Sequence, residues 1–149
     1  MARPQNVLFL CTGNSARSVL AEAILNRTGG GRFVAYSAGS RPKGQVHSQT
    51  LRLLDRLGYP IDRLRSKSWN EFVVSGGPAF DHVITVCNNA AGETCPRFPG
   101  NFTKQHWDIP DPAATVGSPE KVEAAFIAAY DMLSEHIRAF VAGESSAKA

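Results

Sequence analysis

Short apolar runs alternate with helical patterns along this chain. Strands are predicted at residues 6–11, 32–38 and 81–86, with a short fourth strand at 103–107. Helices are predicted at residues 17–28, 48–57 and 69–74, and from 118 to 143. Strands that alternate with helices are typical of an α/β fold, here a three-layer sandwich in which helices flank a four-stranded parallel sheet.

Glycine, proline and serine mark the ends of the predicted helices. Gly29–Gly31 follows a helix instead of opening one, which favours a C-cap and turn over a nucleotide-binding loop. Ser118 is a suitable N-cap for the last helix, with Pro119 at its first position. We expect Gly143 to end that helix and residues 144–149 to form a frayed tail.

Composition narrows the class of protein. The 149 residues are enough for one domain, expected to span residues 1–149. The net charge of +3 comes without a basic run or aromatic–basic interleaving, so nucleic acid is not an expected partner. No apolar stretch has the length of a membrane span or the form of a signal peptide, so we expect a cytoplasmic protein without a membrane partner. Three cysteines in a reducing compartment argue against a disulfide framework.

The segment Cys11-Thr-Gly-Asn-Ser-Ala-Arg17-Ser18 lies between an apolar run and a helical pattern. A strand–loop–helix junction directs backbone N–H groups into one cavity, and the helix dipole there favours anions. The same field holds a cysteine as the thiolate, and Arg17 supplies a planar fork for a tetrahedral oxyanion. Cys11 is therefore the candidate nucleophile. The candidate substrate-binding residues are Thr12, Gly13, Asn14, Ser15, Ala16, Arg17 and Ser18.

Each of these residues also has a purely structural interpretation. A cysteine that ends a strand is often a small core residue, although the turn-forming Gly13–Ser15 favours a cradle here. Ser18 either donates a hydrogen bond to the thiolate or is an ordinary serine of the first helical turn. Asn14 either holds the loop through its amide or merely tolerates a left-handed backbone.

A leaving oxygen needs a proton, so a carboxylic acid is expected opposite the cysteine. Asp111, held before Pro112, is the first candidate, and Asp108 is the second. An aspartate before a proline is more often only a turn former, so this assignment depends on the remaining site.

Cys87 and Cys95 flank a segment of small residues and are eight positions apart. Such a pair can alternate between dithiol and disulfide. If the first and third strands are neighbours, Cys11 and Cys87 lie at the same edge of the sheet. Two other interpretations are a zinc site completed by His82 or His106, whose spacing does not match common zinc modules, and two unrelated buried cysteines.

Together these motifs resemble the bacterial arsenate reductases of the low-molecular-weight tyrosine phosphatase fold. The resemblance covers nearly the whole chain. It rests on the segment 11–18, Ser37-Ala38-Gly39, Cys87, Cys95-Pro96 and His106-Trp107…Asp111-Pro112. The oxyanion loop marks the fold family, and the cysteine pair narrows it to the reductases.

The resemblance implies a relay that reduces arsenate, with phosphate or sulfate as analogues. Cys11 attacks arsenate with help from Asp111, Cys87 attacks the adduct and releases arsenite, and Cys95 then attacks Cys87. An external dithiol, thioredoxin or glutaredoxin, resets the pair. No bound cofactor or metal is expected, and we expect a monomer.

The sequence departs from this pattern in three places. Ala16 stands where some relatives have an additional cysteine outside the relay. Glu22 and Ser37 resemble parts of a potassium site of some relatives, but Ser68 stands where an acidic ligand is expected, so no ion is predicted. The Cys87–Cys95 segment differs from the best-known thioredoxin-coupled form, which leaves the reductant open.

Two alternative functions remain. A low-molecular-weight protein tyrosine phosphatase shares Cys11, Arg17 and Asp111, but it tends to have aromatic residues after the Asp-Pro, where this chain has Ala113-Ala114. An oxyanion sensor that binds through its thiols is the second alternative, and the lack of a basic stripe counts against it.

Overall fold

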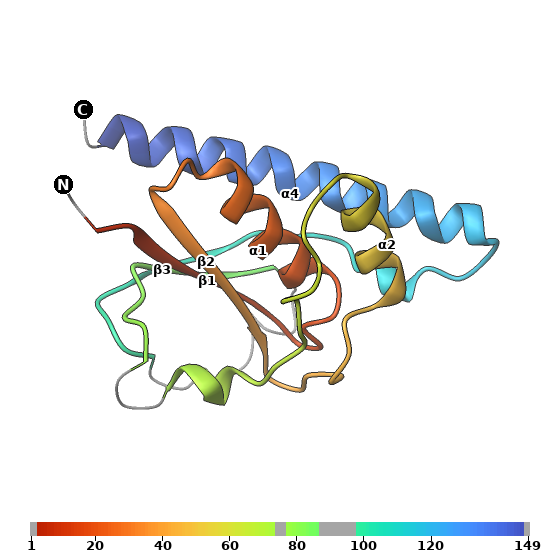
Figure 1. The fold of residues 1–149 in the computed structure, drawn as a ribbon, viewed down its shortest axis with the longest axis horizontal. Helices are drawn as coiled ribbons and strands as arrows, with labels where there is room; N and C mark the ends of the chain where they lie inside the picture. Colours follow the sequence, from red (N-terminus) through yellow and green to blue (C-terminus); the bar gives the residue numbers. More distant parts are fainter. Residues whose placement is uncertain (1–2, 74–76, 87–97, 148–149) are drawn as a thin grey trace.

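The structure is a computed structural model that describes residues 3–73, 77–86 and 98–147 (Figure 1). Its strands form one parallel sheet in the order β2-β1-β3-β4. The strands are β1 (Gln5–Cys11), β2 (Phe33–Gly39), β3 (His82–Thr85) and β4 (Thr103–His106). The predicted four-stranded parallel sheet is confirmed, with strand bounds within one or two residues of those expected.

The central strand β1 is buried on both faces. Its residues Val7 to Leu10 have no exposed surface. Because successive side chains of a strand point to opposite faces, Val7 and Phe9 join one core cluster while Leu8 and Leu10 join the other. The first cluster also contains side chains of the helices α1 (Arg17–Thr28), α2 (Ser48–Arg56) and α4 (Pro119–Ala147). The second cluster contains the aromatic residues Phe72, Phe80 and Phe98.

The helices are α1 (Arg17–Thr28), α2 (Ser48–Arg56) and α4 (Pro119–Ala147). Two short 3-10 turns complete the described elements, η1 (Trp69–Phe72) and η2 (Pro112–Ala114). Figure 1 shows α1 and the long α4 lying together over the sheet, with α2 near the first half of α4. No helix in the described part of the chain is both long and apolar enough to cross a membrane.

Most of the predicted helix ends are confirmed. Gly29 caps α1, and Gly30 and Gly31 follow with left-handed backbones, as expected of a turn. The hydroxyl of Ser118 accepts a hydrogen bond from the Lys121 N–H at 3.2 Å, which is the predicted cap of the last helix.

Two predictions about helices are corrected. The predicted helix at 69–74 is only the single turn η1. Gly143 does not end the last helix, because α4 continues to Ala147 through part of the segment predicted as a frayed tail. A glycine inside a helix costs only about 1 kcal/mol, so helix-forming neighbours on both sides override it.

Candidate active site

The loop between β1 and α1 surrounds a cavity of about 230 Å³. Cys11 ends β1 and Arg17 begins α1, so both lie at the carboxyl edge of the sheet. The lining residues are Cys11, Thr12, Gly13, Ser15, Ala16, Arg17, Arg41, Lys43, Asp111 and Ala113. The structure thus brings the candidate nucleophile, the candidate acid and most of the predicted binding loop to one cavity.

The carbonyl oxygens of this loop accept hydrogen bonds from surrounding segments. Thr12 O accepts from Arg41 N at 3.0 Å, Gly13 O from Lys43 N at 3.0 Å, and Ser15 O from His47 N at 3.0 Å and Thr50 Oγ1 at 2.9 Å. In a trans peptide the N–H points opposite to the carbonyl. The N–H groups of Gly13, Asn14 and Ala16 therefore turn inward, and an anion is the ligand that such a set of donors suits.

Asn14 has both of the properties considered for it. Its backbone is left-handed, with φ of 46°, and its side chain is fully buried. Its Oδ1 accepts from the Lys67 N–H at 2.8 Å, and its Nδ2 donates to Ser18 Oγ at 2.8 Å. Because Ser18 accepts this bond, its hydroxyl hydrogen is left for another acceptor; donation to the Cys11 thiolate stays a prediction.

Arg17 lines the cavity, and most of its N–H groups form no hydrogen bond within the described part of the protein; the Nε–H is one of them. Its side chain is 13% exposed, and Nη1 donates to the Ile109 carbonyl at 2.9 Å. Its Nε is buried and has no hydrogen-bond partner among the described residues. Buried polar groups are nearly always paired, so the Nε–H of this cavity-lining arginine lacks the acceptor that a bound oxyanion could supply.

Asp111 is a turn former that also faces the cavity. Oδ1 accepts from the Ala113 N–H at 3.0 Å and so caps η2, while Oδ2 lies 3.6 Å from Nη2 of Arg17. The two interpretations of this aspartate are therefore compatible. Asp108, the second candidate, does not line the cavity.

Two cations that were not among the predicted site residues, Arg41 and Lys43, also line this cavity. Both are exposed, and neither forms an ion pair or a side-chain hydrogen bond within the described residues. Their backbone N–H groups are bound to the oxyanion loop, so they lie directly beside it. The sequence feature that could have indicated them is that these two cations stand two positions apart just after the strand that ends at Gly39.

Gly39 allows β2 to approach the oxyanion loop closely. A Cβ atom there would lie 2.4 Å from the Thr12 carbonyl oxygen and 3.0 Å from that of Cys11. No side chain fits at these distances, so the glycine of Ser37-Ala38-Gly39 is required by the contact between strand and loop.

The place that resembles a potassium site holds a lysine. Lys67 Nζ donates to the carbonyls of Ser37 at 2.9 Å and Arg65 at 3.0 Å, and lies 3.9 Å from Glu22 Oε1. Glu22 also accepts from the Ser37 hydroxyl at 2.6 Å. An ammonium group already uses these oxygens, so the residues do not fit a potassium ion.

Of the side chains in the zinc alternative, only the histidines lie in the described residues, because Cys87 and Cys95 are outside them. Both ring nitrogens of His82 are hydrogen-bonded, to Thr103 Oγ1 at 2.8 Å and to Gln5 Oε1 at 2.7 Å. In the part of the chain that the structure describes, no group of three or more histidine, cysteine or acidic side chains is arranged to hold a metal.

Cys87 and Cys95 lie outside the described residues. The strand before Cys87 is nevertheless described, and β3 pairs with β1, which is the condition under which Cys11 and Cys87 were expected at the same edge of the sheet. Val86, the residue before Cys87, donates its N–H to the Leu10 carbonyl at 2.9 Å.

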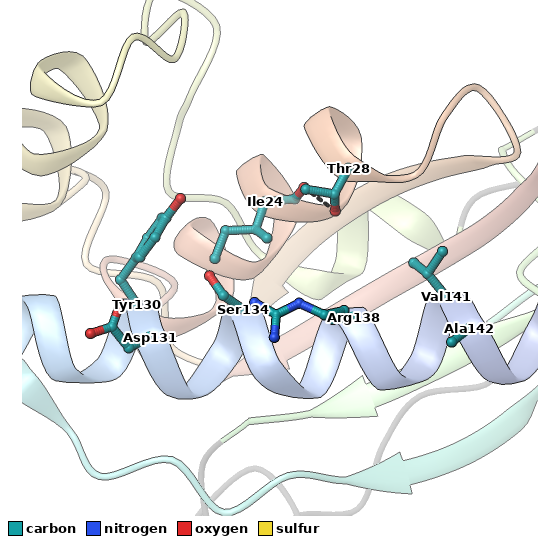
Figure 2. Close-up of a pocket in the computed structure, with 8 residues that line it drawn as sticks. All are labelled: Ile24, Thr28, Tyr130, Asp131, Ser134, Arg138, Val141 and Ala142. Atoms are coloured by element: carbon teal, nitrogen blue, oxygen red, sulfur yellow. Dashed lines mark hydrogen bonds between the residues drawn. The ribbon is translucent and has the colours of Figure 1, made fainter.

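A larger cavity, of about 570 Å³, lies between α1 and α4 (Figure 2). Figure 2 shows Ile24 and Thr28 entering from α1 and the other six lining residues, from Tyr130 to Ala142, from α4. Among the described residues no cysteine lines it, and Thr28 lies about 16 Å along α1 from Arg17 at the usual helical rise. The cavity of about 230 Å³ that Cys11 lines is therefore the candidate active site.

Comparison with known proteins agrees with this geometry. Residues 6–148 match the family described as low molecular weight phosphotyrosine protein phosphatase. An arsenate reductase of Halalkalibacterium halodurans is 32% identical over 134 residues, which are 90% of this chain and 93% of that protein.

The solved structures that this chain resembles include arsenate reductases as well. An arsenate reductase from Archaeoglobus fulgidus superposes with a TM-score of 0.71 at 28% identity, over 91% of this chain and 98% of that one. A thioredoxin-dependent arsenate reductase from Corynebacterium glutamicum has a TM-score of 0.62 at 27% identity, over 93% of this chain and 64% of that one. The chain belongs to the low molecular weight phosphotyrosine protein phosphatase family and is related to its arsenate reductases.

Proposed function

We propose that this protein reduces arsenate to arsenite through a cysteine relay that begins at Cys11. The observation that carries the proposal is that Arg17, which lines the cavity of the Cys11 loop, has a buried Nε without a hydrogen-bond partner among the described residues. An arginine fork beside inward backbone N–H groups suits a tetrahedral oxyanion. The arsenate reductases at about 30% identity give the class of oxyanion.

The first step is attack on arsenic. The Cys11 thiolate forms a sulfur–arsenic bond, and one oxygen leaves as hydroxide, which Asp111 protonates to water. Arg17 and the inward N–H groups stabilise the charge that gathers on the remaining oxygens. Cys11 lies beside the N-terminus of α1, and the positive end of a helix dipole favours a thiolate.

The second step reduces arsenic by two electrons. The Cys87 thiolate attacks Cys11 sulfur, a Cys11–Cys87 disulfide forms, and the electron pair of the sulfur–arsenic bond stays with arsenic, which departs as arsenite. Cys95 then attacks Cys87, which frees the Cys11 thiolate and leaves a Cys87–Cys95 disulfide. The pairing of Val86 with Leu10 supports this order, because Cys87 follows Val86 and Cys11 follows Leu10.

An external dithiol must return the oxidised pair to thiols. Thioredoxin is the first candidate, since a structural relative is described as thioredoxin-dependent, and glutaredoxin is the second. Such chemistry belongs in a reducing compartment, so we place the protein in the cytoplasm. We take a monomer without a bound cofactor as the working unit of this proposal.

Steady-state turnover tests this proposal. The reduced protein should convert arsenate to arsenite continuously with thioredoxin, thioredoxin reductase and NADPH, or with glutathione and glutaredoxin. Serine variants of Cys11, Cys87 and Cys95 should each abolish turnover. Turnover that survives both the Cys87 and Cys95 substitutions would contradict the relay.

Phosphatase activity is the alternative function, because the family that matches this chain is described as a phosphotyrosine protein phosphatase family. The same cavity would hold a phosphate group, and Cys11, Arg17 and Asp111 would act as in the first step. Ala113, however, lines the cavity after Asp111, so this position offers no ring for a phenyl group to stack on. We therefore expect slow hydrolysis of aryl phosphates as a side activity, which the cysteine-pair variants would retain.

A further inference from the structure

Lys67 is a partly buried lysine that the proposed chemistry does not use. Its side chain is 9% exposed, and its Nζ donates to the carbonyls of Ser37 and Arg65. The Glu22 carboxylate, 18% exposed, lies 3.9 Å away and accepts from the Ser37 hydroxyl. The ammonium therefore sits among two carbonyl oxygens and one carboxylate, a set that satisfies a single positive charge.

The attraction between the Lys67 ammonium and the Glu22 carboxylate does not outweigh the cost of removing both charges from water. Burial raises the pKa of Glu22, and the nearby Lys67 only partly offsets it. Burial likewise lowers the pKa of Lys67, against the opposing effect of Glu22. When desolvation outweighs attraction for both partners, a buried pair adds little stability, and a role in fixing a conformation becomes the better explanation.

The backbone of Lys67 is joined to the oxyanion loop. Its N–H donates to Asn14 Oδ1 at 2.8 Å, and its carbonyl accepts from the Gly39 N–H at 2.9 Å. Asn14 in turn holds Ser18 and has the left-handed backbone on which the loop depends. The same residue thus anchors its segment at Nζ and positions the loop through its backbone.

We propose that Lys67 is a positioning residue whose ammonium acts as a built-in monovalent cation, holding its segment against Ser37 so that Asn14 keeps the oxyanion loop in its anion-binding form. The inference rests on the proposed function only in that the loop binds an oxyanion. It follows that oxyanion binding by this protein is indifferent to the monovalent cation in solution. Removal of the side chain would leave a cation-sized space lined by the same oxygens.

Phosphate binding measured by calorimetry tests this without any turnover. In choline chloride, Lys67→Ala should bind phosphate about tenfold more weakly, because the loss of a charged hydrogen-bond donor loosens the loop. Potassium or ammonium chloride at the same ionic strength should restore most of that affinity. The unmodified protein and the surface control Lys104→Ala should bind equally in all three salts.

A double variant removes both charges of the Lys67–Glu22 pair, so that neither charge is left without its partner. Lys67→Met combined with Glu22→Gln should fold, lose phosphate affinity to a similar extent, and gain nothing from potassium, since methionine fills the space. Unchanged affinity in either variant, or a loss in Lys67→Ala that neither potassium nor ammonium relieves, would overturn the proposal. If phosphate binding behaves as expected and arsenite is never formed, the proposed function fails while this inference stands.

Discussion

Asp111 Oδ2 lies 3.6 Å from Arg17 Nη2, and the other oxygen of the same carboxylate caps η2 through the Ala113 N–H. The cap holds the carboxylate in place, and the arginine marks where substrate oxygens would lie. The aspartate is therefore oriented toward the oxygen that leaves, which is the position that an acid catalyst needs.

Asp111→Asn should slow the first chemical step by about a hundredfold or more, while phosphate affinity changes little. An asparagine oxygen still caps η2, so the fold should be retained. Hydrolysis of aryl phosphates provides the measurement, since the loss should shrink for leaving groups that need no proton. An equal loss for all leaving groups would contradict an acid role.

Arg17→Lys should weaken phosphate binding and turnover by about a hundredfold, although the charge is kept. Lysine cannot provide two parallel N–H groups, nor the unpaired Nε. Calorimetry with phosphate measures the binding, with the exposed Arg63→Lys as the matched control. Comparable affinity in the lysine variant would show that charge alone suffices.

Arg41→Ala and Lys43→Ala should raise the KM for arsenate several-fold and leave kcat within about twofold. These exposed cations beside the cavity attract the anion before it binds, so they increase the rate of arsenate binding and not the rate of the chemical step. Added salt should reduce kcat/KM of the unmodified protein more than that of the variants. Lys104→Ala should behave as the unmodified protein; a fall in kcat alone would argue against this role.

Asp81→Asn should lower the free energy of unfolding by about 1 kcal/mol at pH 7. The hydrogen bonds from Arg3 are the main reason that the pKa of Asp81 is below its ordinary value, and the Asn6 N–H adds to them. A lowered carboxylate pKa stabilises the fold above the unfolded value of about 3.9, and this stabilisation is lost as pH falls through the folded value.

Urea unfolding of both proteins measures this pH dependence. The difference between them should hold at pH 6 and shrink as the pH falls below the unfolded pKa of about 3.9. A control, Asp62→Asn, removes a carboxylate that forms no ion pair within the described residues and should show no such trend. A constant difference at all pH values would contradict the assignment.

Two glycine variants should act in opposite directions. Gly39→Ala places a Cβ atom against the Thr12 carbonyl, so it should destabilise the fold by roughly 1–3 kcal/mol and weaken phosphate binding. At Gly143, inside α4, an added Cβ meets no described atom within 4 Å, so Gly143→Ala should be stabilising by up to about 1 kcal/mol. Thermal unfolding distinguishes them; a destabilised Gly143→Ala would argue that the helix ends there.

The parts of this fold that local patterns specify were predictable. The apolar run that ends at Cys11, the small polar loop and the periodic residues after Arg17 together predict the strand, the oxyanion loop and α1. The sheet followed because strands alternated with helices. The errors concern weak local signals, such as Gly143, whose cost inside a helix is small beside the packing of α4 residues like Ile137 and Phe140.

Contacts between distant segments could not be predicted in this way. Lys67 lies 53 positions from Asn14, and only the fold brings its N–H to the asparagine oxygen. Arg41 and Lys43 were assigned to a loop by composition, and their place beside the cavity depends on backbone hydrogen bonds to Thr12 and Gly13. Such pairings carry no pattern in a single sequence.

The measurement that tests the central claim most directly is a single turnover without reductant. Fully reduced protein is mixed with arsenate, arsenite is quantified, and disulfides are mapped by mass spectrometry. The relay predicts one arsenite per chain, together with a Cys87–Cys95 disulfide and a free Cys11 thiol. Unchanged thiols and no arsenite would contradict it and leave phosphate ester hydrolysis as the function of this site.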